Sequence, residues 1–270
     1  MTIHLVHQTL NPQPRRGCAD CTLRDRCLPA GLDVQETNLL DRFIIHNLHI
    51  ARDGAVCRAG CDFHSLYAVR SGFVKGTVTH DDGRERVTSL HMPGELIGMD
   101  AINTGKYMCD AVALEDSSVC AIPFGELERL TRDIPTLQQH LHRTMSREIA
   151  HDYGVMLLLG SMRAEERIAV FLVSLSKRYA ARGYSATRIN LRLKREDIGS
   201  YLGLKHETVS RVLSRFQEGQ LIAVQGKEIA IKDLDRLKQI INYDDAHQRA
   251  SRQALHAVAA APVQSSSQFA

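Results

Sequence analysis

Three cysteines near the start of the chain have the spacing of a metal or redox centre. Cys18, Cys21 and Cys27 form the pattern C-x2-C-x5-C. Thiolates are soft ligands that bind transition metals and react with oxidants, so this group indicates metal or redox chemistry. The spacing alone does not distinguish a zinc site from an iron–sulfur cluster.

A second stretch has residue types suited to reading DNA. The segment KREDIGSYLGLKHETVSRVLSRFQEGQLI has the order of a helix-turn-helix, with a first helix over 196–202 and a second from about His206. Glu207, Ser210 and Arg211 share one face near the start of the second helix, where such a helix meets base edges. Arginine bonds guanine and glutamate accepts a hydrogen bond from cytosine, so this face favours DNA recognition over an ordinary helical hairpin.

The charge balance agrees with this assignment. Residues 166–238 contain 15 Lys and Arg against 8 Asp and Glu, whereas the whole chain has a net charge of only +3. A basic block of this kind is expected of a nucleic-acid-binding domain, although composition by itself fits a solvated charged surface more simply. Lys227 lies in a predicted hairpin over 224–231, placed like a wing contact to phosphate.

The rest of the chain predicts an α+β protein that positions these two groups. Residues 1–30 lack periodicity and are expected to form an irregular arm whose order depends on a ligand. Residues 31–133 hold short apolar segments separated by glycines, which predict a β-roll sensor domain. A winged helix-turn-helix is expected over 163–240, and the polar stretch 241–270 is expected to be a disordered tail.

A long dimerisation helix is predicted over 134–162. Part of its apolar spacing is a heptad seam, so the helix is expected to pair with its copy in a coiled coil. The seam positions are Leu137, Leu141, Met145, Ile149, Met156 and Leu159. Asp152 stands between Ile149 and Met156 where an apolar residue is expected, and in a symmetric dimer it would bring two carboxylates together. The alternative is that Asp152 faces solvent at the edge of an ordinary core helix.

Composition excludes several classes of protein. The chain lacks an apolar run long enough to span a bilayer and a secretory signal, so it is expected to be cytoplasmic and not membrane-bound. In a reducing cytosol its seven cysteines favour free thiols or metal ligands over disulfides. None of the common catalytic motifs for phosphate binding, zinc peptidases or serine hydrolases occurs, so an enzyme is not expected.

Six stretches together resemble the FNR-type regulators of the CRP/FNR superfamily of transcription factors. They are CADCTLRDRC, SLYAVRSG, PGELIG, SSVCAIPF, AEERIAVFL and IGSYLGLKHETVSR. The resemblance implies a cyclic-nucleotide-binding-like β-roll, a dimerisation helix and a winged helix-turn-helix. It also implies a [4Fe-4S] cluster held by Cys18, Cys21, Cys27 and a fourth ligand, Cys120 of SSVCAIPF. Four thiolates are the usual ligand set of such a cluster.

The resemblance further implies an oxygen-sensing regulator that binds palindromic DNA as a homodimer while its cluster is intact. RNA polymerase is then an expected partner, and His206, Glu207, Ser210 and Arg211 are the expected DNA contacts. His206 and Arg84 depart from the family pattern, which affects the expected base preference and polymerase contact. The alternatives are a structural zinc site on the same cysteines, or a nitric-oxide or thiol-redox signal.

The cyclic-nucleotide branch of the superfamily is the main rival. PGELIGMDA keeps the glycine turns of its phosphate-binding cassette, but the following NTGKYMCDAVA lacks the Arg-Ser pair that clamps the cyclic phosphate. The pattern E-x-x-S-R on the second helix also matches the FNR type. No cyclic nucleotide is therefore expected.

The remaining cysteines and the histidines match no ligand pattern. Cys57, Cys61 and Cys109 are predicted to be partly buried small hydrophobic residues. The thirteen histidines, including His46, have no recognisable metal spacing and are predicted to be surface or helper residues.

Overall fold

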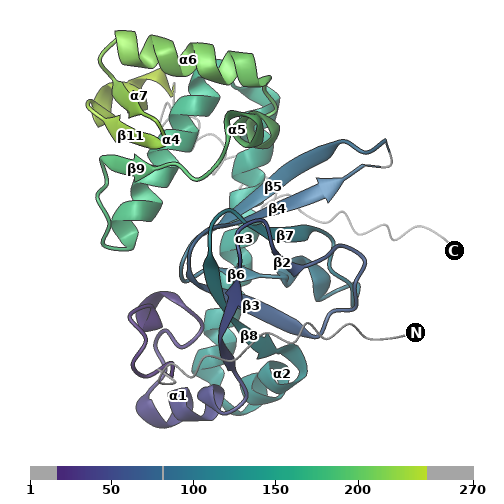
Figure 1. The fold of residues 1–270 in the computed structure, drawn as a ribbon. Helices are drawn as coiled ribbons and strands as arrows, with labels where there is room; N and C mark the ends of the chain where they lie inside the picture. The colour runs from purple at the N-terminus through teal and green to yellow at the C-terminus, as the bar shows by residue number, and fades with distance from the viewer. Residues whose placement is uncertain (1–16, 81, 242–270) are drawn as a thin grey trace, which may run out of the picture. The chain divides into compact units, whose positions relative to one another are not determined.

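A computed structural model describes residues 17–80 and 82–241 of the chain (Figure 1). The described residues form two compact units. One comprises 17–161 with 191–209, and the other comprises 162–190 with 210–241. The predicted tail and the first part of the predicted arm lie outside the described residues.

The first unit contains the expected β-roll, built from two four-stranded antiparallel sheets in the orders β1-β8-β3-β6 and β2-β7-β4-β5. The strands are β1 (Ile45–Ile50), β2 (Ala55–Cys57), β3 (Ser65–Ser71), β4 (Val74–Thr79), β5 (Glu85–His91), β6 (Leu96–Ile97), β7 (Asp110–Ala113) and β8 (Ser117–Pro123). Gly72 makes the turn between β3 and β4 with φ +84°, and a side chain there would overlap Ser117. Only glycine meets both conditions.

Two helices of the first unit were not expected, one before the first strand and one over 124–133 after the last strand. The predicted roll begins near residue 31, but α1 occupies Val34–Asp41 before the first strand. Asp33 and Glu36 form a capping box, in which the Glu36 N–H donates to Asp33 (2.8 Å) and the Asp33 N–H donates to Glu36 (2.9 Å). This reciprocal cap satisfies two backbone groups and stabilises the start of α1. A short 3-10 helix, η2 (Met99–Ala101), follows β6.

The arm, the roll and two further helices share one hydrophobic core. α2 (Phe124–Asp133) follows β8 directly, and α3 (Pro135–Ser161) is the long helix expected over 134–162. Leu28 of the arm, Leu66 of β3 and Leu137 of α3 are all at most 1% exposed within this core. The same core that orders the arm therefore also fixes the start of α3.

The second unit and the segment 191–209 supply the expected DNA-binding elements. They are α4 (Ala164–Ala181), β9 (Arg188–Asn190), α5 (Arg195–Leu202), α6 (His206–Glu218), β10 (Ile222–Gln225), β11 (Glu228–Ile231) and α7 (Leu234–Ile240). β9, β10 and β11 form a small antiparallel sheet in the order β10-β11-β9. Across the described ranges no helix has the length and apolarity needed to cross a bilayer.

Candidate metal centre and nucleic-acid interface

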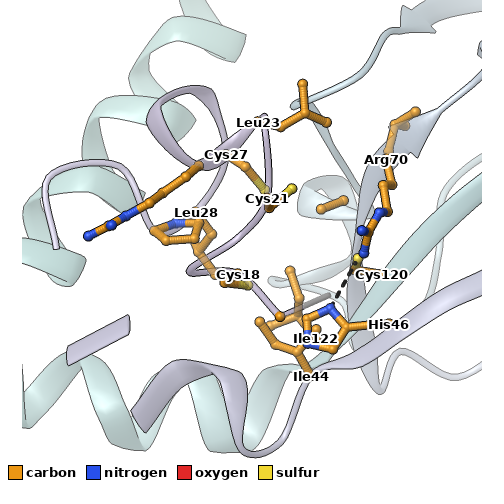
Figure 2. A pocket seen from close by; sticks show the side chains of 15 residues that line it. Cys18, Cys21, Leu23, Cys27, Leu28, Ile44, His46, Arg70, Cys120 and Ile122 are labelled. Atoms are coloured by element: carbon orange, nitrogen blue, oxygen red, sulfur yellow. Dashed lines mark hydrogen bonds between the residues drawn. The ribbon is translucent and has the colours of Figure 1, made fainter. Parts of the chain in front are cut away.

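The four cysteines predicted as ligands line one pocket between the arm and the roll (Figure 2). The pocket has about 440 Å³ of space, including its opening to solvent, and its wall is mostly apolar. Cys18, Cys21 and Cys27 enter it from the arm, while Cys120 enters from β8. Cys18 and Cys120, which are 102 positions apart in the sequence, therefore line the same pocket.

Tight turns bring the three arm cysteines to the same side. The Cys21 N–H donates to the Cys18 carbonyl (3.3 Å), and the Cys27 N–H donates to the Leu23 carbonyl (2.9 Å) through the short 3-10 helix η1 (Arg24–Arg26). The Arg24 guanidinium donates to the Leu32 carbonyl (2.7 Å) and closes the arm as a loop. Such turns allow residues at C-x2-C-x5-C spacing to face a common centre.

Burial shapes the acidity of three pocket thiols, those of Cys18, Cys27 and Cys120. Burial raises the pKa of Cys18, with the Asp41 carboxylate beside it acting in the same direction. Burial raises the pKa of Cys27 to about 12. It also raises the pKa of Cys120, opposed by a backbone hydrogen bond from Asn47 and by Arg70. These thiols keep their protons at neutral pH until a metal displaces them, so metal binding here releases protons.

The donor set limits which metal group fits the pocket. Four cysteine sulfurs that line one pocket are the usual ligand set of an iron–sulfur cluster. Four thiolates can also hold a single tetrahedral zinc ion. Both sequence-based alternatives therefore agree with the side chains present.

Sequence reasoning missed two residues beside the cysteines: His46, which lines the pocket, and Asp41, which contacts His46 and Cys18. His46 was predicted as a surface or helper residue, but its side chain is only 10% exposed, and its Nδ1 lies 3.6 Å from the Cys120 sulfur (Figure 2). Its Nε2 lies 2.8 Å from Asp41, whose carboxylate accepts from the Cys18 N–H (2.8 Å). No local spacing signals this grouping, because Asp41 ends a helix that the sequence pattern did not predict.

The other three cysteines lie away from this pocket. Cys57 is buried in a second core where β2 pairs with β7, and Cys109 is partly buried just before β7. Both match the prediction of small hydrophobic residues. Cys61 does not, because it is exposed. Cys61 directly follows Gly60, which has a positive φ of 78°.

The predicted DNA-reading face lies on α6. His206, Glu207, Ser210 and Arg211 are exposed, whereas the intervening Val209, Val212, Leu213 and Phe216 are buried. This division shows one polar and one packed face, as a recognition helix requires. Gly199 of α5 permits the turn into α6, because a side chain there would come within 2.5 Å of the Leu204 carbonyl. Lys227 is exposed in the turn between β10 and β11, as expected for a wing tip.

The residues predicted to form a dimer seam divide into two groups on α3. Leu137 and Leu141 are buried inside the protomer's own core, so they are not free to pair with a second copy. Ile149 and Met156 are 56% and 67% exposed, and Asp152 is exposed between them. Tyr153 and Leu157, which the heptad pattern did not include, are 67% and 54% exposed. Only the second half of α3 therefore presents an apolar face.

Comparison with protein families agrees with this architecture. Residues 48–133 match the cyclic nucleotide-binding domain, and residues 166–240 match the Crp-like helix-turn-helix domain. A cyclic nucleotide-binding domain followed by a Crp-like helix-turn-helix domain defines a DNA-binding transcription regulator.

The relatives narrow the class further. The chain is 45% identical over 216 residues to the transcriptional activator protein Anr of Pseudomonas protegens, covering 80% of this chain and 88% of that protein. It is 42% identical over 226 residues to the fumarate and nitrate reduction regulatory protein of Escherichia coli, covering 84% and 90%. The solved structure of FixK2 from Bradyrhizobium japonicum superimposes with a TM-score of 0.67 at 28% identity, covering 73% and 97%. The chain belongs to the FNR-type branch of the CRP/FNR family of transcription regulators.

Proposed function

We propose that this protein is an oxygen-sensing regulator that binds palindromic DNA as a homodimer when a [4Fe-4S] cluster is intact. The observation that carries the proposal is the pocket in which Cys18, Cys21, Cys27 and Cys120 meet. Relatives named for anaerobic growth support the low-oxygen signal, among them an anaerobic regulatory protein of Haemophilus influenzae that is 45% identical over 223 residues, covering 83% of this chain and 87% of that protein.

The donor set and the relatives together favour the cluster over the zinc alternative. Four cysteines supply a complete thiolate set for a [4Fe-4S] cluster. The relatives are named for anaerobic regulation and for fumarate and nitrate reduction. When bound, the cluster supplies an oxygen-labile bond between the arm and β8. The chain's own residues do the rest, because the turns of the arm orient three ligands and β8 holds the fourth.

The shared core offers a route from the pocket to α3. Cys18 and Leu28 of the arm pack in the same core as Leu137 and Leu141 of α3. When the arm is tied to β8 by its ligands, this packing fixes the first half of α3. When the arm is released, that support weakens. The signal therefore passes by side-chain contact over a short distance.

The exposed second half of α3 is the surface through which two protomers would pair once the arm holds the first half of the helix in place. Ile149, Tyr153 and Met156 together expose an apolar stripe, which costs free energy in a monomer. Asp152 within the stripe opposes pairing, since two carboxylates would approach each other in a symmetric dimer. A dimer would present two copies of α6 to the two halves of a palindrome, and RNA polymerase is the expected partner at the promoter.

Anaerobic purification of the full chain tests the cluster directly. We expect about four iron and four sulfide per chain, and on exposure to air both are lost while the mass falls from dimer to monomer. Cys120→Ser should take up no stable cluster, whereas Cys61→Ser, with an exposed thiol outside the pocket, should behave as the unmodified chain. Zinc without sulfide whose binding requires Cys21, Cys27 and Cys120 would contradict the proposal, as would a cluster unaffected by Cys120→Ser.

A further inference from the structure

One compact group of ligand atoms lies at the edge of the cysteine pocket. The Cys18 sulfur, an Asp41 carboxylate oxygen and a His46 ring nitrogen all lie within 4.8 Å of one another. Over the described residues this is the only group of three such atoms so close together. Only Cys18 belongs to the proposed cluster ligands. The other two residues come from the end of α1 and from β1, so the fold has assembled a second donor set.

The histidine and the carboxylate of this group already lie against each other. The His46 side chain is only 10% exposed, and its Nε2 lies 2.8 Å from Asp41 Oδ1, within ion-pair distance but without the geometry of a hydrogen bond. A divalent cation bound by both side chains would replace this contact, and it would compensate the burial of both groups.

The remaining geometry holds the donors in place. Asp41 Oδ1 accepts from the Cys18 N–H (2.8 Å), so the carboxylate and the first cysteine are fixed to each other. On the other edge of the ring, His46 Nδ1 contacts the Cys120 sulfur at 3.6 Å, which sets the orientation of the imidazole. Ligands oriented by such secondary contacts lose little freedom on metal binding.

The chemistry of the three donors selects the class of ion. A thiolate, an imidazole and a carboxylate together suit a borderline divalent ion such as Zn²⁺ or Co²⁺, whereas Ca²⁺ and Mg²⁺ prefer oxygen ligands alone. Three protein ligands leave the fourth tetrahedral position to water.

We propose that the cluster-free protein binds one zinc-class divalent ion through Cys18, Asp41 and His46. This site differs from a zinc site on the four cysteines, because it uses neither Cys21 nor Cys27. Since Cys18 serves both groups, the ion and the cluster exclude each other. That competition rests on the proposed function, whereas the ion site itself does not. A cell with excess zinc would then hold part of the regulator in a form that cannot receive its cluster.

Cobalt titration of the full-length chain, prepared anaerobically without cluster, tests the site. Co²⁺ reports its ligands by visible absorption and by thiolate charge-transfer bands whose intensity grows with the number of sulfurs. We expect one Co²⁺ per chain with the charge transfer of one thiolate. His46→Gln and Asp41→Asn should each weaken cobalt binding by about tenfold or more. The Cys21→Ser/Cys27→Ser double variant should bind cobalt as the unmodified chain does.

The same four proteins are then supplied with iron and sulfide, and circular dichroism compares their folding. Cobalt binding that needs Cys21 and Cys27 and ignores both His46→Gln and Asp41→Asn would overturn the ion site. If the unmodified chain takes up no cluster while cobalt binding depends on His46, the proposed function fails and the ion site stands. If zinc added first leaves cluster assembly unchanged, the competition is wrong.

Discussion

At the scale of single residues, the seven cysteines differ in environment more than in sequence context. Four line the pocket, one is buried and one partly buried elsewhere in the roll, and one is exposed. Spacing predicted Cys18, Cys21 and Cys27 as metal ligands, and the family resemblance added Cys120; all four line the pocket. The sequence could not predict which side chains contact these thiols, because His46 and Asp41 come next to Cys120 and Cys18 only when the chain folds. Contacts of this kind have no signature at a fixed offset along the chain.

The acidity of the cysteines outside the pocket predicts their reactivity. Burial raises the pKa of Cys57 and of Cys109 to about 12 in each case, and Asp100 acts in the same direction. Only the thiolate reacts with iodoacetamide, and at pH 7 roughly one such thiol in 10⁵ is ionised. We expect rapid labelling of exposed Cys61, and labelling of the other two that rises about tenfold per pH unit up to their pKa. Mass spectrometry of labelled peptides measures this.

Labelling in urea provides the control, because all seven cysteines should then react. If Cys109 is modified as fast as Cys61 in the native protein, its environment differs from that described. Either result separates an inert buried thiol from a reactive one, which neither its spacing nor the family pattern could do.

The contacts of individual side chains on DNA are also separable. Arg211 is exposed on the face of α6 predicted to meet base edges, while Lys227 is exposed at the wing tip. Arg211→Ala should cost ~1–3 kcal/mol of binding free energy and relax the preference for one base pair. Lys227→Ala should weaken binding to all sequences alike and lower the salt slope by about 1. Binding measured by fluorescence anisotropy at several salt concentrations distinguishes the two, and equal effects on specificity would contradict the assignment.

Among the helices and strands, hydrophobic periodicity predicted the elements that bury one face. It did not predict a short helix whose start is marked mainly by its capping residues. The sequence pattern predicted α3 and α6 from apolar residues at helical spacing, and it predicted the roll from short apolar segments separated by glycines. It missed α1 and α2, which lie inside the range predicted as roll. α1 has only eight residues, which give too short a pattern, although Asp33 and Glu36 stand at the spacing of a capping box. The sequence pattern also treated α3 as one seam, since burial of Leu137 inside the protomer cannot be inferred from spacing.

The exposed half of α3 gives the sharpest prediction at this scale. Asp152→Ala removes the carboxylate from the stripe formed by Ile149, Tyr153 and Met156, so the cluster-free protein should dimerise in air. We expect the dimer Kd to fall by about tenfold or more, which corresponds to ~1.4 kcal/mol. Sedimentation equilibrium measures the change.

Two further variants make this result interpretable. Asp133→Ala removes an exposed carboxylate at the end of α2, outside the stripe, and should leave the protein monomeric in air. Ile149→Glu adds charge within the stripe and should prevent dimers even in the anaerobic, cluster-loaded protein. A monomeric Asp152→Ala would show that this carboxylate does not control pairing.

At the scale of the whole molecule, the proposal requires that the arm act on α3 through their common core. Leu28 of the arm is 1% exposed there, and Leu172 of α4 is equally buried in the other unit. Replacing either by alanine leaves a cavity and should cost ~2–5 kcal/mol of the free energy of unfolding. The two variants should therefore lose a similar free energy of unfolding. Only Leu28→Ala removes packing that lies between the cysteines and α3.

We expect Leu28→Ala to retain its iron and sulfide under anaerobic conditions, because its ligands are unchanged, yet to dimerise less tightly than the unmodified chain. Leu172→Ala should lose similar stability and keep its dimer affinity. Urea unfolding gives the first quantity and anaerobic sedimentation gives the second. If both variants dimerise as the unmodified chain does, the arm does not signal through this core. If both lose dimer affinity equally, the effect is one of general stability, and the coupling must follow another route.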